Sequence, residues 1–188
     1  MRLRSRTRAP LLAAAMLVSG CGYNTIQSMD ERVNQAQGQI QTQLQRRSDL
    51  IPNLVNTVKG ITKHEDTVFI SIANARARLS GAVQSGNVPE MAAANQQLSQ
   101  GLGRLLAISE NYPQLRSSEN FKQLQDQLEG TENRIAVARQ DYNGAVGEYN
   151  AYIRRFPYNL TAKIFGLGKP REYFEAQAGA AAAPKVQF

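Results

Sequence analysis

The sequence predicts an all-α protein: an antiparallel up-and-down bundle of about four long helices, followed by an irregular C-terminal tail. Two observations support this fold class. Apolar residues recur at steps of three and four along most of the chain, which is the spacing of one face of a helix. In addition, no stretch combines apolar–polar alternation with the turn residues that are typical of strands.

The first apolar series takes 28 positions in eight steps, a mean of 3.5. This mean is typical of helices that pack along each other at shallow angles, as in bundles and coiled coils. One member of the series, Arg47, is charged. The apolar members are Val33, Ala36, Ile40, Leu44, Ile51, Leu54, Val58 and Ile61.

Pro52 lies inside this series and leaves two interpretations open. In the favoured one, Asp49 caps a new helix and Pro52 occupies its first turn, where proline is well tolerated. In the other, one long kinked helix continues through Pro52. That helix loses a hydrogen bond and crowds the carbonyl of Ser48, at a cost of ~3 kcal/mol. The unbroken spacing across Pro52 supports the second interpretation.

Polar residues and prolines mark the later helix ends. Residues 87–90, Asn-Val-Pro-Glu, predict an N-cap followed by proline in the first turn. Residues 111–113, Asn-Tyr-Pro, end this third segment, and Ser117 or Ser118 can cap the fourth. Residues 156–157, Phe-Pro, end the fourth segment.

The fourth segment carries a second apolar series, which covers 35 positions in ten steps and again averages 3.5. Its members are Phe121, Leu124, Leu128, Thr131, Ile135, Ala138, Tyr142, Ala145, Tyr149, Tyr152 and Phe156.

The tail beyond Pro157 is too apolar to remain free in water, so we expect it to fold back onto the bundle. Its large apolar residues are Leu160, Ile164, Phe165, Leu167, Tyr173 and Phe174. The alanine-rich end, residues 177–188, has little to bury and is expected to be disordered.

The first twenty residues resemble a bacterial lipoprotein signal. Four arginines precede an apolar stretch over residues 11–18, and Ser19 and Gly20 lead to Cys21, the only cysteine. We therefore expect residues 1–20 to be removed. Cys21 then begins the mature chain and carries lipid, such as palmitate, and residues 21–176 form the bundle.

Other interpretations of this segment are weaker. Eight apolar residues span roughly 12 Å of helix against a ~30 Å hydrocarbon core, which disfavours a permanent transmembrane helix. An ordinary secretory signal needs no cysteine after its cleavage point. Several acyl chains on Cys21 would hold the protein firmly to a membrane, with the bundle facing the periplasm. The signal resembles those of lipoproteins in Gram-negative envelopes. This resemblance implies that Gly22, in place of aspartate after the lipidated cysteine, slightly favours sorting to the outer membrane.

Net charge gives little support for nucleic-acid binding. The full chain carries 22 basic and 15 acidic residues, a net charge of +7. Four arginines leave with the signal, so the mature chain keeps 18 basic residues and a net charge of +3. Acylation of Cys21 also removes the only thiol, which excludes disulfide formation and thiol chemistry.

No residue pattern predicts an enzyme, a cofactor or a metal. His64 is the only histidine, and no free cysteine accompanies it to complete a metal site. Glu65 and Asp66 are adjacent, so on a helix they point about 100° apart and do not form an acid–base pair. We therefore expect no catalytic residue, no cofactor and no small-molecule substrate.

Arg47 requires a different explanation, because it falls on the apolar face of its helix and a buried arginine must be paired. We predict that it meets a carboxylate such as Glu132 on the fourth segment.

Residues 43–60, Gln-Leu-Gln-Arg-Arg-Ser-Asp-Leu-Ile-Pro-Asn-Leu-Val-Asn-Thr-Val-Lys-Gly, resemble the signature of the LemA family. Further matches at 110–113, 119–121, 128–135 and 141–143 extend the likeness over nearly all of the mature chain. The family-motif residues, for which we expect a structural or interaction role, are Arg46, Arg47, Asp49, Pro52, Asn53, Glu132, Asn133 and Arg134.

The resemblance implies an antiparallel helical bundle at a bacterial membrane, with no established enzymatic mechanism. The chain departs from the family pattern in two places. Gln37 stands where members usually have tryptophan, and the signal ending at Cys21 replaces the usual N-terminal membrane helix.

These observations favour a non-enzymatic scaffold or adaptor that displays its bundle to unidentified proteins of the bacterial cell envelope. The alternative is an enzyme of unfamiliar type. Its polar cluster would be Arg47, Asp49, Asn53, Glu132, Asn133 and Arg134, and a deep pocket joining these residues would favour it. Direct binding to a lipid surface is disfavoured by the modest charge of +3 and by the lack of a basic amphipathic face.

Overall fold

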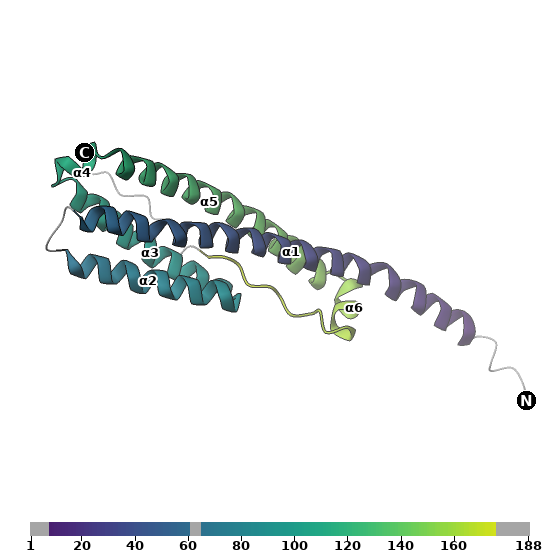
Figure 1. The fold of residues 1–188 in the computed structure, drawn as a ribbon. Coiled ribbons are helices and arrows are strands. Elements are labelled where there is room, and N and C mark those ends of the chain that lie inside the picture. Colours follow the sequence, from purple (N-terminus) through teal and green to yellow (C-terminus); the bar gives the residue numbers. More distant parts are fainter. Residues whose placement is uncertain (1–7, 61–64, 176–188) are drawn as a thin grey trace, which may run out of the picture. The chain divides into compact units, whose positions relative to one another are not determined.

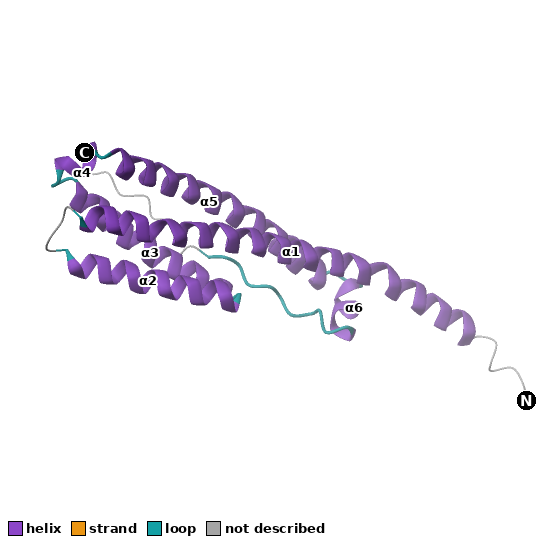
Figure 2. Ribbon diagram, viewed as in Figure 1, coloured by secondary structure: helices purple, strands orange, loops and turns teal. Residues whose placement is uncertain are grey.

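The computed structural model describes residues 8–60 and 65–175, with side chains from Gly22 onward. Its helices are α1 (Arg8–Lys59), α2 (Asp66–Ser85), α3 (Val88–Ser109), α4 (Pro113–Ser117), α5 (Glu119–Arg154) and α6 (Tyr158–Ile164) (Figure 1). Over these two stretches every regular element is a helix, so the predicted all-α class is confirmed (Figure 2). Four of the helices are long, as expected.

The chain forms two compact units. The first contains Met1–Gln37 and Asp141–Arg171, and the second contains Gly38–Gln140 and Glu172–Phe188. Helices α1 and α5 contribute residues to both units, because the boundaries fall inside them. Helices α2, α3 and α4 belong wholly to the second unit, and α6 belongs to the first.

In the second unit, α1 and α2 run antiparallel. The side-chain amide of Gln41 donates to the carbonyl of Val83 at 3.2 Å. Further along α1, the hydroxyl of Ser48 lies 3.4 Å from that of Ser80. The partner's number falls as the number along α1 rises, which is the order that antiparallel neighbours require.

Helix α3 returns alongside α2 after a tight connection. Gly86 adopts a left-handed conformation (φ 68°) at the end of α2, and Asn87 then caps α3 as predicted. The Oδ1 of Asn87 accepts a hydrogen bond from the amide of Glu90 at 3.1 Å. Farther along, a Cβ at Gly101 would stand only 2.9 Å from Cγ1 of Ile72, so this glycine allows the two helices to approach closely.

Pro52 lies inside α1, so the favoured break between Asp49 and Pro52 is wrong and the single-helix interpretation is confirmed. Proline has no amide hydrogen to donate to the carbonyl four residues earlier, which is that of the buried Ser48. In the structure, Nε of Arg76 on α2 donates to this carbonyl at 2.9 Å. A contact between helices therefore replaces the missing hydrogen bond within α1, which ends instead at Lys59, before Gly60.

The first apolar series forms the buried face of α1. Ile61 lies outside the residues that the structure describes. The other seven apolar members are at most 8% exposed, and they are Val33, Ala36, Ile40, Leu44, Ile51, Leu54 and Val58.

The second series is buried or half-buried as far as Tyr142, and Tyr149 is buried as well, but the buried position shifts by one residue at two later members. Val146 and Ile153 are buried where the pattern placed Ala145 and Tyr152. Phe156, the last predicted member, is 75% exposed because α5 ends at Arg154 and no longer directs this side chain.

The predicted helix stops agree with the structure. Helix α3 ends at Ser109, shortly before the Asn-Tyr-Pro sequence, and the short α4 begins at Pro113. Helix α5 begins at Glu119, directly after Ser118.

The tail is partly regular, because it contains α6. Gly166 ends this helix in a left-handed conformation (φ 72°). Two hydrogen bonds complete the turn, from the amide of Gly166 to the carbonyl of Lys163 and from the amide of Leu167 to that of Ala162. Among the tail's large apolar residues Phe174 is buried, as expected. Against expectation, four are exposed: Leu160, Ile164, Phe165 and Tyr173. Residues 177–188 lie outside the described part of the chain.

Replacing Arg76 with methionine should lower the free energy of unfolding by roughly 1–3 kcal/mol, because the buried Ser48 carbonyl loses its donor. Pro52→Ala should reduce this loss, since the helix then supplies its own amide. Thermal denaturation of the wild type, the two single variants and the double variant measures the coupling. Arg78→Met, on the exposed face of α2, is the matched control and should cost less. Equal losses with and without Pro52→Ala would contradict the explanation.

Candidate functional site

The buried Arg47 is the first candidate site residue. It lies between Leu44 and Ile51 on the buried face of α1 and is 5% exposed. Its Nη1 donates to Oδ1 of Asn95 on α3 at 2.7 Å and forms an ion pair with Oε2 of Glu132 on α5 at 2.6 Å. The predicted pairing of Arg47 with Glu132 is confirmed. One guanidinium nitrogen thus connects three helices of the second unit.

The electrostatics of the Arg47–Glu132 ion pair indicate a structural role. Burial lowers the pKa of Arg47, and the carboxylate of Glu132 acts in the opposite direction. Arginine stays charged at neutral pH even so, because its ordinary pKa lies far above neutrality, and it does not serve as an acid or a base. Its Nε is buried without a hydrogen-bond partner among the groups described, whereas Glu132 is half exposed to water.

The other motif residues do not converge on this pair. Five of them are exposed on α1 or α5: Arg46, Asp49, Asn53, Asn133 and Arg134. Asp49 accepts a hydrogen bond from Nε2 of Gln45 at 2.8 Å, within the same helix. Of the six residues in the alternative enzyme site, the structure brings together Arg47 and Glu132 alone.

Three surface hollows of the second unit lie away from the motif. One of about 430 Å³ is lined by Pro89 and Tyr173, among others. Another, of about 300 Å³, lies between α2 and α3 beside Arg104, and a third of the same size lies beside Phe121. None of the three is lined by Arg47, Glu132 or another motif residue. These hollows therefore give the enzyme alternative no support.

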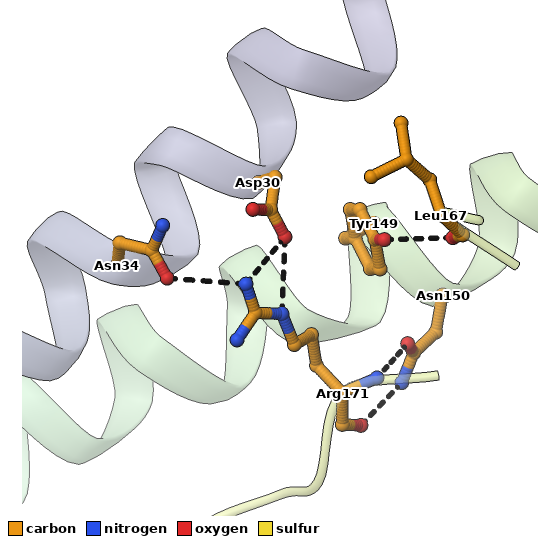
Figure 3. Close-up of polar contacts among 6 residues, drawn as sticks. All are labelled: Asp30, Asn34, Tyr149, Asn150, Leu167 and Arg171. Atoms are coloured by element: carbon orange, nitrogen blue, oxygen red, sulfur yellow. Dashed lines mark hydrogen bonds and ion pairs between the residues drawn. The ribbon is translucent and has the colours of Figure 1, made fainter. Parts of the chain in front are cut away.

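A second polar cluster lies in the first unit, around Arg171 (Figure 3). The guanidinium donates to Oδ1 of Asp30 through Nε at 3.0 Å and Nη2 at 2.7 Å, and Nη2 also reaches Oδ1 of Asn34 at 3.2 Å. Asn150 on α5 holds the backbone of the same residue. Its side chain accepts from the Arg171 amide at 2.8 Å and donates to the Arg171 carbonyl at 2.9 Å. The cluster clamps the segment after α6 to both α1 and α5.

Tyr149 extends this clamp by donating its hydroxyl hydrogen to the carbonyl of Leu167 at 2.8 Å (Figure 3). Burial and the carboxylate of Asp30 raise the pKa of Tyr149, and Arg171 lowers it. A tyrosine hydroxyl is protonated at neutral pH, as a donor must be, and the net rise of the pKa extends this state to higher pH. Sequence reasoning missed the cluster because Asp30 and Arg171 are 141 positions apart, and no local pattern relates them.

Two of the residues considered as site candidates fall outside what the structure describes. These are His64 and the side chain of Cys21, so removal of residues 1–20 and lipidation of Cys21 stay predictions. No helix in the described stretches is long and apolar enough to cross a membrane. The same stretches hold no group of three or more His, Cys, Asp or Glu residues placed to bind a metal ion.

Comparison with known proteins identifies relatives over most of the chain. A family model described as LemA family matches residues 36–188. Magnetosome proteins MamQ 1 and MamQ 2 of Paramagnetospirillum magneticum AMB-1 are each 30% identical to this chain, over 81% of the chain and 64% of the relative. Magnetosome protein MamQ of Magnetospirillum gryphiswaldense is 27% identical, over 84% and 66%. The chain thus spans slightly less than two thirds of the length of these relatives.

Replacing Glu132 with glutamine should lower the free energy of unfolding by roughly 1–3 kcal/mol, because the buried Arg47 cation loses its charged partner. Circular dichroism during heating measures the change as a lower Tm. Glu129→Gln is the matched control, since Glu129 is an exposed carboxylate one turn earlier on α5. A Tm equal to that of the control would show that the ion pair contributes nothing to stability.

Proposed function

This chain belongs to the LemA family, and from that premise we propose that it is a non-enzymatic scaffold or adaptor of the bacterial cell envelope. The bundle is tethered to a membrane through acylated Cys21 and faces the periplasm, on the outer membrane by preference. Its partners are other proteins of the envelope.

The proposal is supported by where the polar residues of the family motif lie in the structure. Arg47 ties α1 to α3 and α5, and five other motif residues are exposed on the surfaces of α1 and α5. An enzyme needs groups that converge on a reacting atom, within hydrogen-bond reach of one another. Exposed polar residues on a rigid helix instead suit recognition of a partner surface.

The similarity to the magnetosome proteins supports a proposal only for the region that this chain shares with them. Their role belongs to proteins of which this chain spans 64–66%, so whatever depends on the remaining third is not carried over. The helical region that the chains share is the part we assign to scaffolding.

Cys21→Ala should move the protein from the membrane fraction to the soluble envelope fraction, because the acyl chains provide the tether. Fractionation of cells that express either form measures the distribution. Intact-mass analysis of the wild type should show a chain that begins at residue 21 and carries acyl groups. A variant that stays membrane-bound would contradict the lipid anchor and favour an uncleaved N-terminal helix.

A photocrosslinking amino acid in place of Asn133 or Asn53 should capture the same specific envelope protein in living cells, because both positions are exposed members of the family motif. The matched control is Gln127, which is exposed on α5 outside the motif and should give a weaker product. Mass spectrometry identifies the captured chain. The absence of a crosslinked product at both motif positions would contradict a scaffold that binds its partner through these residues.

A further inference from the structure

A cluster of large apolar side chains at the end of the first unit remains exposed to water. Phe156 is 75% exposed, Leu160 51%, Ile164 76% and Phe165 51%. We call these four residues the α6 patch. Phe156, Leu160 and Ile164 follow one another at intervals of four residues, and the latter two lie one turn apart on α6. Several large exposed apolar residues within one short segment mark an interaction site more often than a single exposed residue does.

The orientation of α6 explains why the patch is unburied. The helix buries its small residues, Thr161 and Ala162, toward the rest of the unit. The ring of Tyr158 also stacks on that of Tyr152, with centroids 4.4 Å apart. Helix α6 therefore packs through one side and exposes Leu160 and Ile164 on another. A helix at a protein surface usually does the reverse and buries its large apolar residues.

The α6 patch lies beside the residues that follow Cys21. The ring of Tyr158 covers Gly22 so closely that a Cβ there would stand 2.6 Å from the ring. The ring of Phe165, a member of the patch, packs against that of Tyr23 with centroids 4.7 Å apart. Both contacts lie within the first unit, one and two residues from the expected lipid attachment point.

The chain around the patch is basic. Residues 149–171 contain five basic residues and no acidic residue, although the whole mature chain carries only +3. One of the five, Arg171, is paired with Asp30, which leaves four others: Arg154, Arg155, Lys163 and Lys169. Arg154 and Arg155 directly precede Phe156 in the chain, and Lys163 directly precedes Ile164. All three are exposed. Basic side chains around an apolar surface complement anionic lipid headgroups, and each contributes about 1 kcal/mol near such a membrane.

We propose that the α6 patch inserts into the headgroup region of the membrane that holds Cys21, with anionic phospholipid as the occupant of this surface. The inference rests on the proposed lipid anchor and adds to it a second, non-covalent contact. Neither the net charge of +3 nor the linear pattern indicates the patch. It forms because the fold leaves Leu160 and Ile164 outward and places Phe165 on Tyr23.

The test uses the full mature chain, acylated at Cys21, in vesicles of neutral and anionic phospholipid with brominated acyl chains. Ile164→Cys provides the only free thiol, which carries a fluorophore that bromine quenches. We expect about a twofold or greater loss of emission relative to vesicles without bromine, because position 164 lies among the lipids. The matched control is Ile70→Cys, which is 60% exposed on α2 in the second unit and should show little quenching.

Leu160→Ser in the protein labelled at position 164 should reduce the quenching about twofold, since it removes apolar area from the patch. Val137→Ser, which changes an exposed apolar residue of α5, should leave it unchanged. Protein that floats with the vesicles while position 164 is no more quenched than position 70 would overturn the α6 contact and leave the anchor intact. Protein that does not float with the vesicles would overturn both.

Discussion

A charged side chain on an apolar helix face restricts how the helices of the second unit can pack. Arg47 satisfies its charge through Asn95 and Glu132 on two other helices. If α3 or α5 slipped by a residue, the cation would be left buried without a partner, at a cost that apolar packing does not recover. Apolar contacts are non-directional, so they distinguish less sharply between neighbouring registers than a charge that needs a specific partner. The ion pair therefore selects one register among several that would bury similar area.

Pro52 and Arg171 show where sequence reasoning succeeds and where it stops. Helical spacing predicted the buried face of α1 and placed Arg47 on it, because the period is visible locally. The pairing with Glu132 was predicted from a different rule, that a buried arginine needs a charged partner. The helix break expected at Pro52 is absent, and α1 continues through this residue. The Ser48 carbonyl, which Pro52 cannot bond, accepts a hydrogen bond from Arg76 on another helix. The clamp around Arg171 was invisible for the same reason: its partner Asp30 is distant in sequence, and only the tertiary fold brings them together.

The polar chemistry of the chain is used to hold helices and to fasten the tail. Asn150 and Tyr149 hold the segment after α6 through its backbone, so its course does not depend on burial of its apolar side chains. This explains how Leu160 and Ile164 can remain in water without releasing the segment. Helices held in place by such contacts present rigid surfaces, and a rigid surface loses little conformational entropy when a partner docks.

The contact between Asp30 and Arg171 also limits the order in which the protein can assemble. It joins residues 141 positions apart, so the first unit cannot complete its fold until nearly the whole chain has been synthesised. The segment next to Cys21 is therefore synthesised before the residues that pack around it in the first unit. The closure of this long loop comes late, so the segment that contains Arg171 is the last one needed to complete the first unit.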